Sequence, residues 1–269
     1  MIKREKKIIK DINIPQKAVV YDNFAPYYDK YMRHVDYDKW VKKILDIYSL
    51  HSSSKLTDIL ELACGTCNVS QKLVGMGYKV TATDRSMQML KYAEQKPNAP
   101  KLYLSVMTDP LPEASYDLIL LVFDSINYLL EYTDVSTLLS NISIALKKGG
   151  LFIFDISTYK NSSDNFDDYT HVDDSINHCL IHRAEFDHIK RLQKTRITIF
   201  QKQDNHYFRM DEEHIQKVYY VHELLQLCDS SPIECTGIYS QSYDKNLLKT
   251  NTKKLDHQYS RLFFVLKNK

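Results

Sequence analysis

Short apolar runs alternate with amphipathic stretches along the middle of the chain, and this alternation predicts an α/β fold. The runs expected to form strands lie near 58–63, 78–83, 101–106, 116–122 and 151–156. Because strands that alternate with helices are joined by right-handed crossovers, these strands should pair in parallel in one sheet. Two helices are expected before the first strand, at about 24–32 and 38–48, where they would form an N-terminal cap.

The stretch 134–147 is the clearest expected helix. Asp134 is expected to cap its first turn, and Gly149 offers a left-handed stop before the next strand. The apolar residues that recur at helical spacing are Val135, Leu138, Leu139, Ile142 and Leu146.

After residue 159 the pattern becomes that of an antiparallel insertion. The segment 161–168 is polar and is expected to form a loop, whereas 196–200 and 206–210 have the composition of antiparallel strands. We interpret 160–220 as an inserted lid. The main unit would then comprise 21–159 and 221–269, with its last helix and strands near 221–229, 233–240 and 260–267.

The segment 59–70 carries the most informative motif, Ile-Leu-Glu-Leu-Ala-Cys-Gly-Thr-Cys-Asn-Val-Ser. It predicts a buried strand with the acidic Glu61, a sharp turn at Gly65, and a helix from about Asn68. The next strand ends in Asp84, at the sheet edge where a carboxylate could accept hydrogen bonds from a ribose diol. A turn with a single glycine is poorly suited to pyrophosphate, so a dinucleotide is not favoured.

With these residues the chain resembles the class I S-adenosylmethionine-dependent methyltransferases, whose first motif is roughly E/D-x-G-x-G-x-G. Within them, the closer likeness is to small bacterial enzymes that include sugar-amine N-methyltransferases. It covers most of residues 20–269 and implies a Rossmann-like, mostly parallel sheet of seven strands with helices on both faces. Further matching segments occur in the family's order at 21–29, 84–90, 116–120, 123–129 and 146–155.

The resemblance also implies how S-adenosyl-L-methionine would be held. Backbone around Ala63 and Gly65 would meet its amino-acid end, with Glu61 near the ammonium, and Asp84 would hold the ribose. Arg85 and Met89 would cover the sugar and adenine, although Met89 could instead be only a core residue. The remaining candidates are Tyr21 and Tyr28, which resemble family tyrosines that close over the cofactor, and Val106, Met107 and Phe123.

Two departures from the family pattern bear on this site. Val106 stands where relatives often carry the acid that accepts the adenine amino hydrogen, so Asp109 or backbone would have to substitute. Cys67 replaces a glycine and creates a C-x-x-C with Cys64, the spacing of a thioredoxin redox pair. Asp84 and the later motifs oppose a redox role, and without a second C-x-x-C pair a zinc site is not expected.

Methyl transfer from a sulfonium is an in-line displacement, so alignment and exclusion of water can supply most of the acceleration. Tyr128 and His214 are the candidates for proton transfer, although relatives carry His at the position of Tyr128 and a solvent-exposed strand would leave His214 without a role. Asp155 either faces the acceptor or is structural. His171, His178 and His182 are expected at the surface, since their spacing matches no metal motif.

Composition bears on the expected binding partners and cellular compartment. The net charge of +2 disfavours a polyanionic partner such as nucleic acid, and the basic residues of 1–20 are expected to form a solvated extension. Five cysteines and no apolar leader favour the cytoplasm, and no apolar run is long enough for a membrane span.

We therefore expect a methyltransferase, monomeric or homodimeric, that acts on nitrogen or oxygen of a small molecule. Two alternatives remain: a methyltransferase-like protein that only binds a ligand or partner, suggested by Ala63, Cys67 and Val106, and an enzyme that methylates tRNA or protein.

Overall fold

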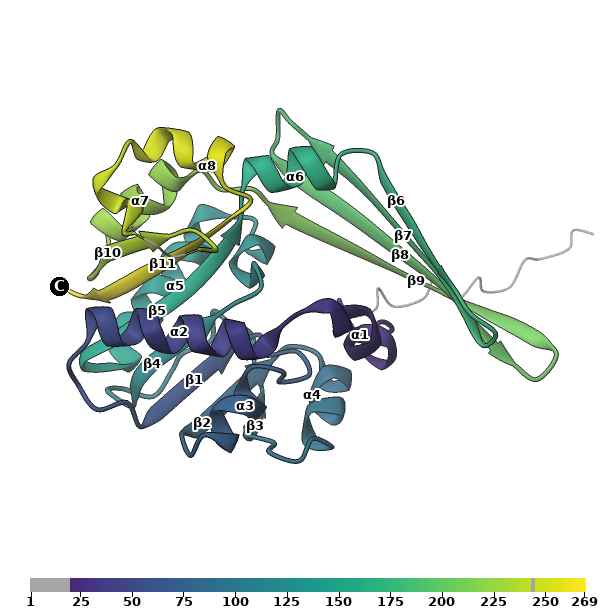
Figure 1. The fold of residues 1–269 in the computed structure, drawn as a ribbon, viewed down its shortest axis with the longest axis horizontal. Helices are drawn as coiled ribbons and strands as arrows, with labels where there is room; N and C mark the ends of the chain where they lie inside the picture. The colour runs from purple at the N-terminus through teal and green to yellow at the C-terminus, as the bar shows by residue number, and fades with distance from the viewer. Residues whose placement is uncertain (1–19, 243–244) are drawn as a thin grey trace, which may run out of the picture.

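A computed structural model of the chain describes residues 20–242 and 245–269. The expected basic extension, 1–20, lies outside the described residues except for its last position. The described chain forms a seven-stranded sheet and a separate four-stranded sheet (Figure 1).

The larger sheet has the strand order β10-β11-β5-β4-β1-β2-β3. Strands β1 to β5 pair in parallel, and β11 runs antiparallel between β5 and β10. This mostly parallel, Rossmann-like sheet confirms the predicted fold class. Its strands are β1 (Asp58–Leu62), β2 (Lys79–Asp84), β3 (Lys101–Leu104), β4 (Tyr116–Leu121), β5 (Leu146–Ser157), β10 (Ile233–Tyr239) and β11 (Arg261–Asn268).

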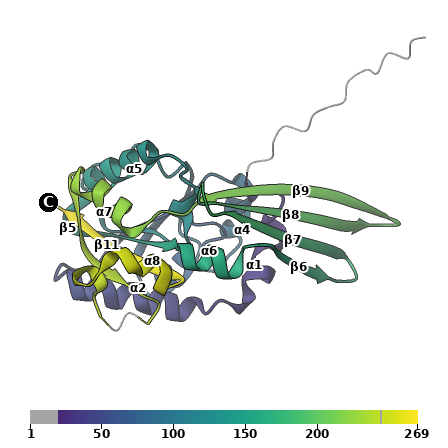
Figure 2. The ribbon, with the colours of Figure 1, turned by 90° about the horizontal axis from the view of Figure 1, so that it is seen from above.

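Helices cover both faces of this sheet, as predicted. Helix α2 (Tyr37–His51) lies on one face, and α5 (Tyr132–Ala145) and α7 (Val221–Asp229) lie on the other (Figure 2). The remaining helices are α1 (Ala25–Tyr31), α3 (Ser70–Gly75), α4 (Met87–Glu94), α6 (Tyr159–Asn165) and α8 (Leu255–Gln258), with short 3-10 turns η1 (Met32–His34), η2 (Ser125–Tyr128), η3 (Leu247–Lys249) and η4 (Thr252–Lys254).

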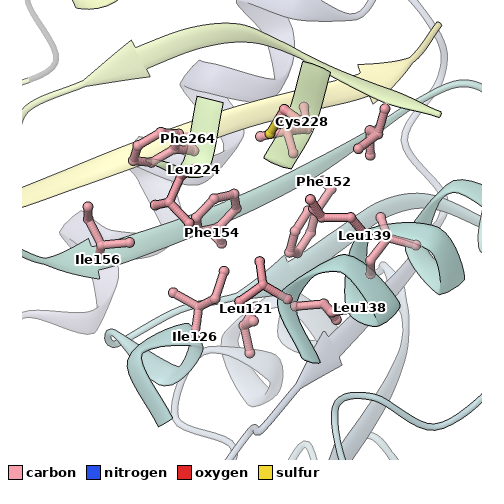
Figure 3. Close-up of a cluster of buried hydrophobic side chains, with 14 of the residues drawn as sticks. Leu121, Ile126, Leu138, Leu139, Phe152, Phe154, Ile156, Leu224, Cys228 and Phe264 are labelled. Atoms are coloured by element: carbon pink, nitrogen blue, oxygen red, sulfur yellow. The ribbon is translucent and has the colours of Figure 1, made fainter. Parts of the chain in front are cut away.

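The central strands are apolar on both sides because each side packs under a helical layer. Leu121 and Phe154 point toward α5 and α7, where Leu138 and Leu224 meet them (Figure 3). Ile153 belongs to the cluster on the opposite face, beneath α2. Burial of an aliphatic or aromatic side chain here contributes about 1.5–3 kcal/mol, and this packing fixes the strand ends on which the site is built.

The four-stranded sheet is the antiparallel insertion predicted after the fifth strand. It projects away from the larger sheet, between β5 and α7 in the chain (Figure 1). Asn127 of η2 holds the two ends of this insertion, because its side chain donates to the carbonyls of Ser157 and Lys217 and accepts from Ser157 N. The strands are β6 (Tyr169–Asp174), β7 (His178–Asp187), β8 (Leu192–Gln203) and β9 (His206–Lys217).

Three local predictions were wrong. Helix α5 begins at Tyr132, so Asp134 lies in its first turn instead of capping it. Gly149 has the expected left-handed φ of +80°, but it lies inside β5, four residues beyond the end of α5. The polar segment 161–168 is partly helical, because the Thr158 side chain accepts from Asn161 N and starts α6.

Candidate active site

A cavity of about 340 Å³ opens at the carboxyl ends of β1, β2 and β4. We call it the cofactor cavity. This is the edge at which open parallel sheets bind their ligands. All the residues predicted to bind the cofactor line it: Tyr21, Tyr28, Glu61, Ala63, Gly65, Asp84, Arg85, Met89, Val106, Met107 and Phe123.

The turn between β1 and α3 has an unusual backbone. Ala63, Gly65 and Cys67 all have positive φ, at +50°, +55° and +61°. An added Cβ at Gly65 would meet nothing closer than Tyr28 Cε1 at 4.0 Å, so the left-handed conformation, and not space, favours glycine there. Ala63 and Cys67 stand at glycine positions of the family's first motif counted from Glu61, and they adopt conformations that glycine accommodates at lower cost.

Two buried carboxylates stand on either side of this turn. Asp84 accepts from Gly65 N and Ser86 N, each at 2.8 Å, so it shapes the turn as well as facing the cavity. Glu61 accepts from the Ser70 hydroxyl. Burial raises the pKa of Asp84, and it raises the pKa of Glu61 to about 7. A cationic ligand beside them would relieve this cost, since an opposite charge favours the ionised form.

The segment after β3, which the resemblance places beside adenine, contributes no carboxylate to the cavity. Val106, Met107 and Thr108 line it, whereas Asp109 is not among the lining residues. Asp109 instead accepts from the Ser105 hydroxyl at 2.7 Å and from Val106 N at 2.9 Å. Its side chain therefore supports the turn that presents Val106 and Met107.

Cys64 and Cys67 are free and buried beneath the turn. Burial raises the pKa of Cys64 well above that of an ordinary thiol. A redox cysteine needs a lowered pKa and access to its partner, so the environment of Cys64 disfavours the thioredoxin-like interpretation.

A second cavity, of about 180 Å³, adjoins the cofactor cavity. We call it the second cavity. Its wall toward the cofactor cavity is formed by residues that line both: Tyr21, Tyr28, Phe123 and Tyr128. Its other side is formed by β7, β8 and β9, which contribute the polar residues His182, Gln193 and His214 as well as the apolar Ile197. A molecule in the second cavity would therefore contact the same four side chains as a ligand in the cofactor cavity.

Tyr128 and His214, the two predicted catalytic residues, are in contact. Tyr128 Oη lies 3.0 Å from His214 Nδ1 and 2.7 Å from Tyr21 Oη. Phe123 and Asp124 have left-handed φ values of +60° and +50°, and this turn after β4 directs η2 and Tyr128 into the wall. Burial raises the pKa of Tyr128, so its hydroxyl is protonated in the free protein.

A charged cluster lies at the base of the second cavity. Arg261 pairs with Asp124 at 2.8 Å and also with Asp155, and Gln216 donates to Asp124 at 2.7 Å. Burial raises the pKa of Asp155 to about 6. Asp155 lines neither cavity, so its position fits a structural role better than contact with the acceptor. Asp124 and Arg261 line the second cavity.

The comparisons with known proteins agree with this geometry. A family model described as "Methyltransferase domain" matches residues 60–154. "Putative methyltransferase GWCH70_2453" of Geobacillus sp. (strain WCH70) is 30% identical over 267 residues, which are 93% of this chain and 100% of the relative. The chain belongs to the class I S-adenosylmethionine-dependent methyltransferases.

Solved structures of methyltransferases share the whole fold. An S-adenosylmethionine-dependent methyltransferase from Clostridium acetobutylicum ATCC 824 superposes with a TM-score of 0.75 at 27% identity, over 92% of this chain and 98% of that one. The sugar N-methyltransferase KedS8 from Streptoalloteichus sp ATCC 53650 has a TM-score of 0.71 at 14% identity, over 98% and 100%. S-adenosylmethionine is thus the methyl donor of this methyltransferase.

The residues present fit this donor. Glu61 and Asp84 are carboxylates with little exposure, at 2% and 7%, and both line the cofactor cavity, where they would suit the ammonium, sulfonium and ribose diol of the donor. The predicted hydrogen bonds to the donor remain predictions. No helix in the described part of this methyltransferase is long and apolar enough to cross a membrane.

Sequence reasoning was wrong about one histidine and missed several residues. His182 is buried, not at the surface, because β7 turns it toward the second cavity; its Nδ1 lies 2.7 Å from Tyr31 Oη. His171 is exposed and His178 is half-buried. Glu212 and Arg261 were also missed. The signal for Glu212 was its spacing, since Glu212, His214 and Gln216 alternate along one face of β9.

Proposed function

We propose that the enzyme transfers the methyl group of S-adenosylmethionine to nitrogen or oxygen of a small molecule held in the second cavity. The observation that carries this proposal is the wall shared by the two cavities, formed by Tyr21, Tyr28, Phe123 and Tyr128. The likeness to a sugar N-methyltransferase supports a small acceptor.

The shared wall suits an in-line displacement. Bound S-adenosylmethionine supplies an activated methyl group, and the enzyme must place a nucleophile opposite the sulfur. Tyr21 and Tyr28 line both cavities, and their rings would keep water from the reacting atoms where the cavities meet. The β6–β9 sheet acts as the acceptor-side lid in this proposal, because β7, β8 and β9 supply the opposite wall.

Tyr128 and His214 are proposed as the catalytic pair. As the nucleophile forms its new bond, its proton must leave, and Tyr128 lines both cavities. The high pKa of a buried tyrosine disfavours a free tyrosinate, so His214 at 3.0 Å is proposed to take the tyrosine proton. We also propose that the enzyme acts in the cytoplasm.

The test is transfer of radiolabelled methyl from S-adenosylmethionine to a bacterial extract divided by ultrafiltration. Label in the small-molecule fraction is expected. Label only in the protein or RNA fraction would overturn the small-acceptor proposal. For the catalytic pair, Tyr128→Phe is expected to lower kcat by roughly 10²–10⁴-fold with unchanged binding of S-adenosylhomocysteine. Tyr27→Phe is the matched control, because Tyr27 lines neither cavity.

A further inference from the structure

Glu212 makes more connections around the site than its place in an inserted strand suggests. Its side chain on β9 is buried and accepts from the backbone of the segment 21–24: Oε1 from Asn23 N at 2.5 Å and Phe24 N at 3.1 Å, and Oε2 from Tyr21 N at 3.0 Å. Oε2 also lies 3.2 Å from His214 Nε2. One carboxylate therefore joins the segment that carries Tyr21 to the imidazole behind Tyr128.

These contacts fix the direction of the hydrogen bonds beyond Glu212. Three backbone amides donate to its carboxylate, and an ionised carboxylate is an acceptor only. His214 must then carry its proton on Nε2, which donates to Glu212 and leaves Nδ1 as an acceptor. Tyr128 donates to Nδ1, so the Tyr21 hydroxyl, at 2.7 Å, must donate to the Tyr128 oxygen. Every donor in this chain of hydrogen bonds therefore points toward Glu212.

We propose that Glu212 is a positioning residue that sets this direction and, with the same carboxylate, docks the segment 21–24 against the cofactor cavity. The inference rests on the proposed function of Tyr128 and His214. As a consequence, His214 Nδ1 is free to accept a proton in the same arrangement that places Tyr21 in the wall of the cofactor cavity.

In this proposal the acceptor's proton leaves through Tyr128 as the methyl group is transferred. The carbon–sulfur bond of the methyl donor breaks as the bond from carbon to the acceptor nitrogen or oxygen forms. The acceptor's proton passes to the Tyr128 oxygen, and the Tyr128 proton passes to His214 Nδ1. The imidazolium that results is stabilised by Glu212 at 3.2 Å. With the opposite tautomer Nδ1 would already carry a proton, and the transfer could not occur.

The experiment measures the tautomer of His214 by ¹⁵N NMR of the full chain saturated with S-adenosylhomocysteine. The His214 signals are assigned by their loss in His214→Phe. In the wild type, Nε2 is expected to be protonated and Nδ1 to be bare. In Glu212→Gln the side-chain amide can donate to Nε2, so the proton is expected to move to Nδ1. Glu213→Gln is the matched control, because the adjacent Glu213 pairs with Lys194 and Arg196 instead.

A second readout tests the docking of the segment 21–24. Glu212→Gln is expected to weaken binding of S-adenosylhomocysteine by roughly tenfold, and Glu213→Gln by less than about twofold. A protonated Nδ1 in the wild type, which needs no variant, would overturn the inference. So would an unchanged tautomer in folded Glu212→Gln. Failure of the proposed function would look different: the wild-type tautomer would be as expected, but no small molecule would be methylated.

Discussion

Replacement of Asp84 by Asn tests the cofactor cavity at its most constrained point. Asp84 is 7% exposed and its two oxygens already accept from Gly65 N and Ser86 N, each at 2.8 Å. Each oxygen retains a lone pair that a ribose hydroxyl could use. The substitution removes the charge and turns one acceptor into a donor at almost the same size.

The magnitude follows from these contacts. A charge-assisted hydrogen bond to the ribose is worth about 1–3 kcal/mol, which corresponds to a roughly 5- to 150-fold increase in Kd. The free protein should also become less stable, because one backbone N–H of the turn loses its acceptor, at a cost of about 1–3 kcal/mol. Both effects arise from one carboxylate, so they should appear together.

Calorimetric titration with S-adenosylhomocysteine measures the first effect, and urea denaturation of the free protein measures the second. Asp58→Asn is the matched control, because it also removes one carboxylate charge. Asp58 is the first residue of β1, at the end of the strand opposite the cofactor cavity, and it pairs with Lys147 at 2.5 Å. A folded Asp84→Asn protein that binds within about twofold of the wild type would refute the role of Asp84 in the cavity.

Three further predictions address other parts of the site. Burial raises the pKa of Glu61 to about 7, and the ammonium of the methyl donor favours the ionised carboxylate, so affinity for S-adenosylmethionine should fall by up to about tenfold per pH unit below pH 7. The same pH dependence in titrations of Glu61→Gln would contradict this. Ala63→Gly should leave stability unchanged or raise it by up to about 1 kcal/mol in urea denaturation, since it relieves a left-handed φ of +50° but adds unfolded-state entropy, and a clear loss would argue against that strain. Arg261→Met should destabilise the protein by about 3–5 kcal/mol, because the buried Asp155 and the half-buried Asp124 would be left without their cation. A loss below about 1 kcal/mol would show that the two carboxylates are not ionised together.

The parallel sheet and the cofactor cavity could be predicted from sequence because their signals are local. The strand before Gly65, the turn and Asp84 lie within one unit of strand, helix and strand, and each has a composition that only a few structures accommodate. The positive φ of Ala63 and Cys67 could not be predicted from the sequence, because neither alanine nor cysteine favours that conformation.

The second cavity could be predicted only in part. It combines Tyr21, Tyr128 and His214, which are far apart in sequence and meet only when the antiparallel sheet lies beside η2 and the segment 21–24. The surface prediction for His182 failed for the same reason: strand register decides which face of a strand is buried, and the pairing partner cannot be read from the strand itself.

The attachment of the β6–β9 sheet through Asn127 has a consequence for how such enzymes diversify. Both ends of the inserted sheet meet at one side chain, so the insertion leaves and rejoins the larger sheet at nearly the same point. The cofactor cavity draws no lining residue from β6 to β9. Under the proposed function, an exchange of these strands with those of a relative that keeps Asn127 and Glu212 would therefore change which acceptor is recognised while retaining the methyl donor. New specificity would then evolve by replacement of one compact unit.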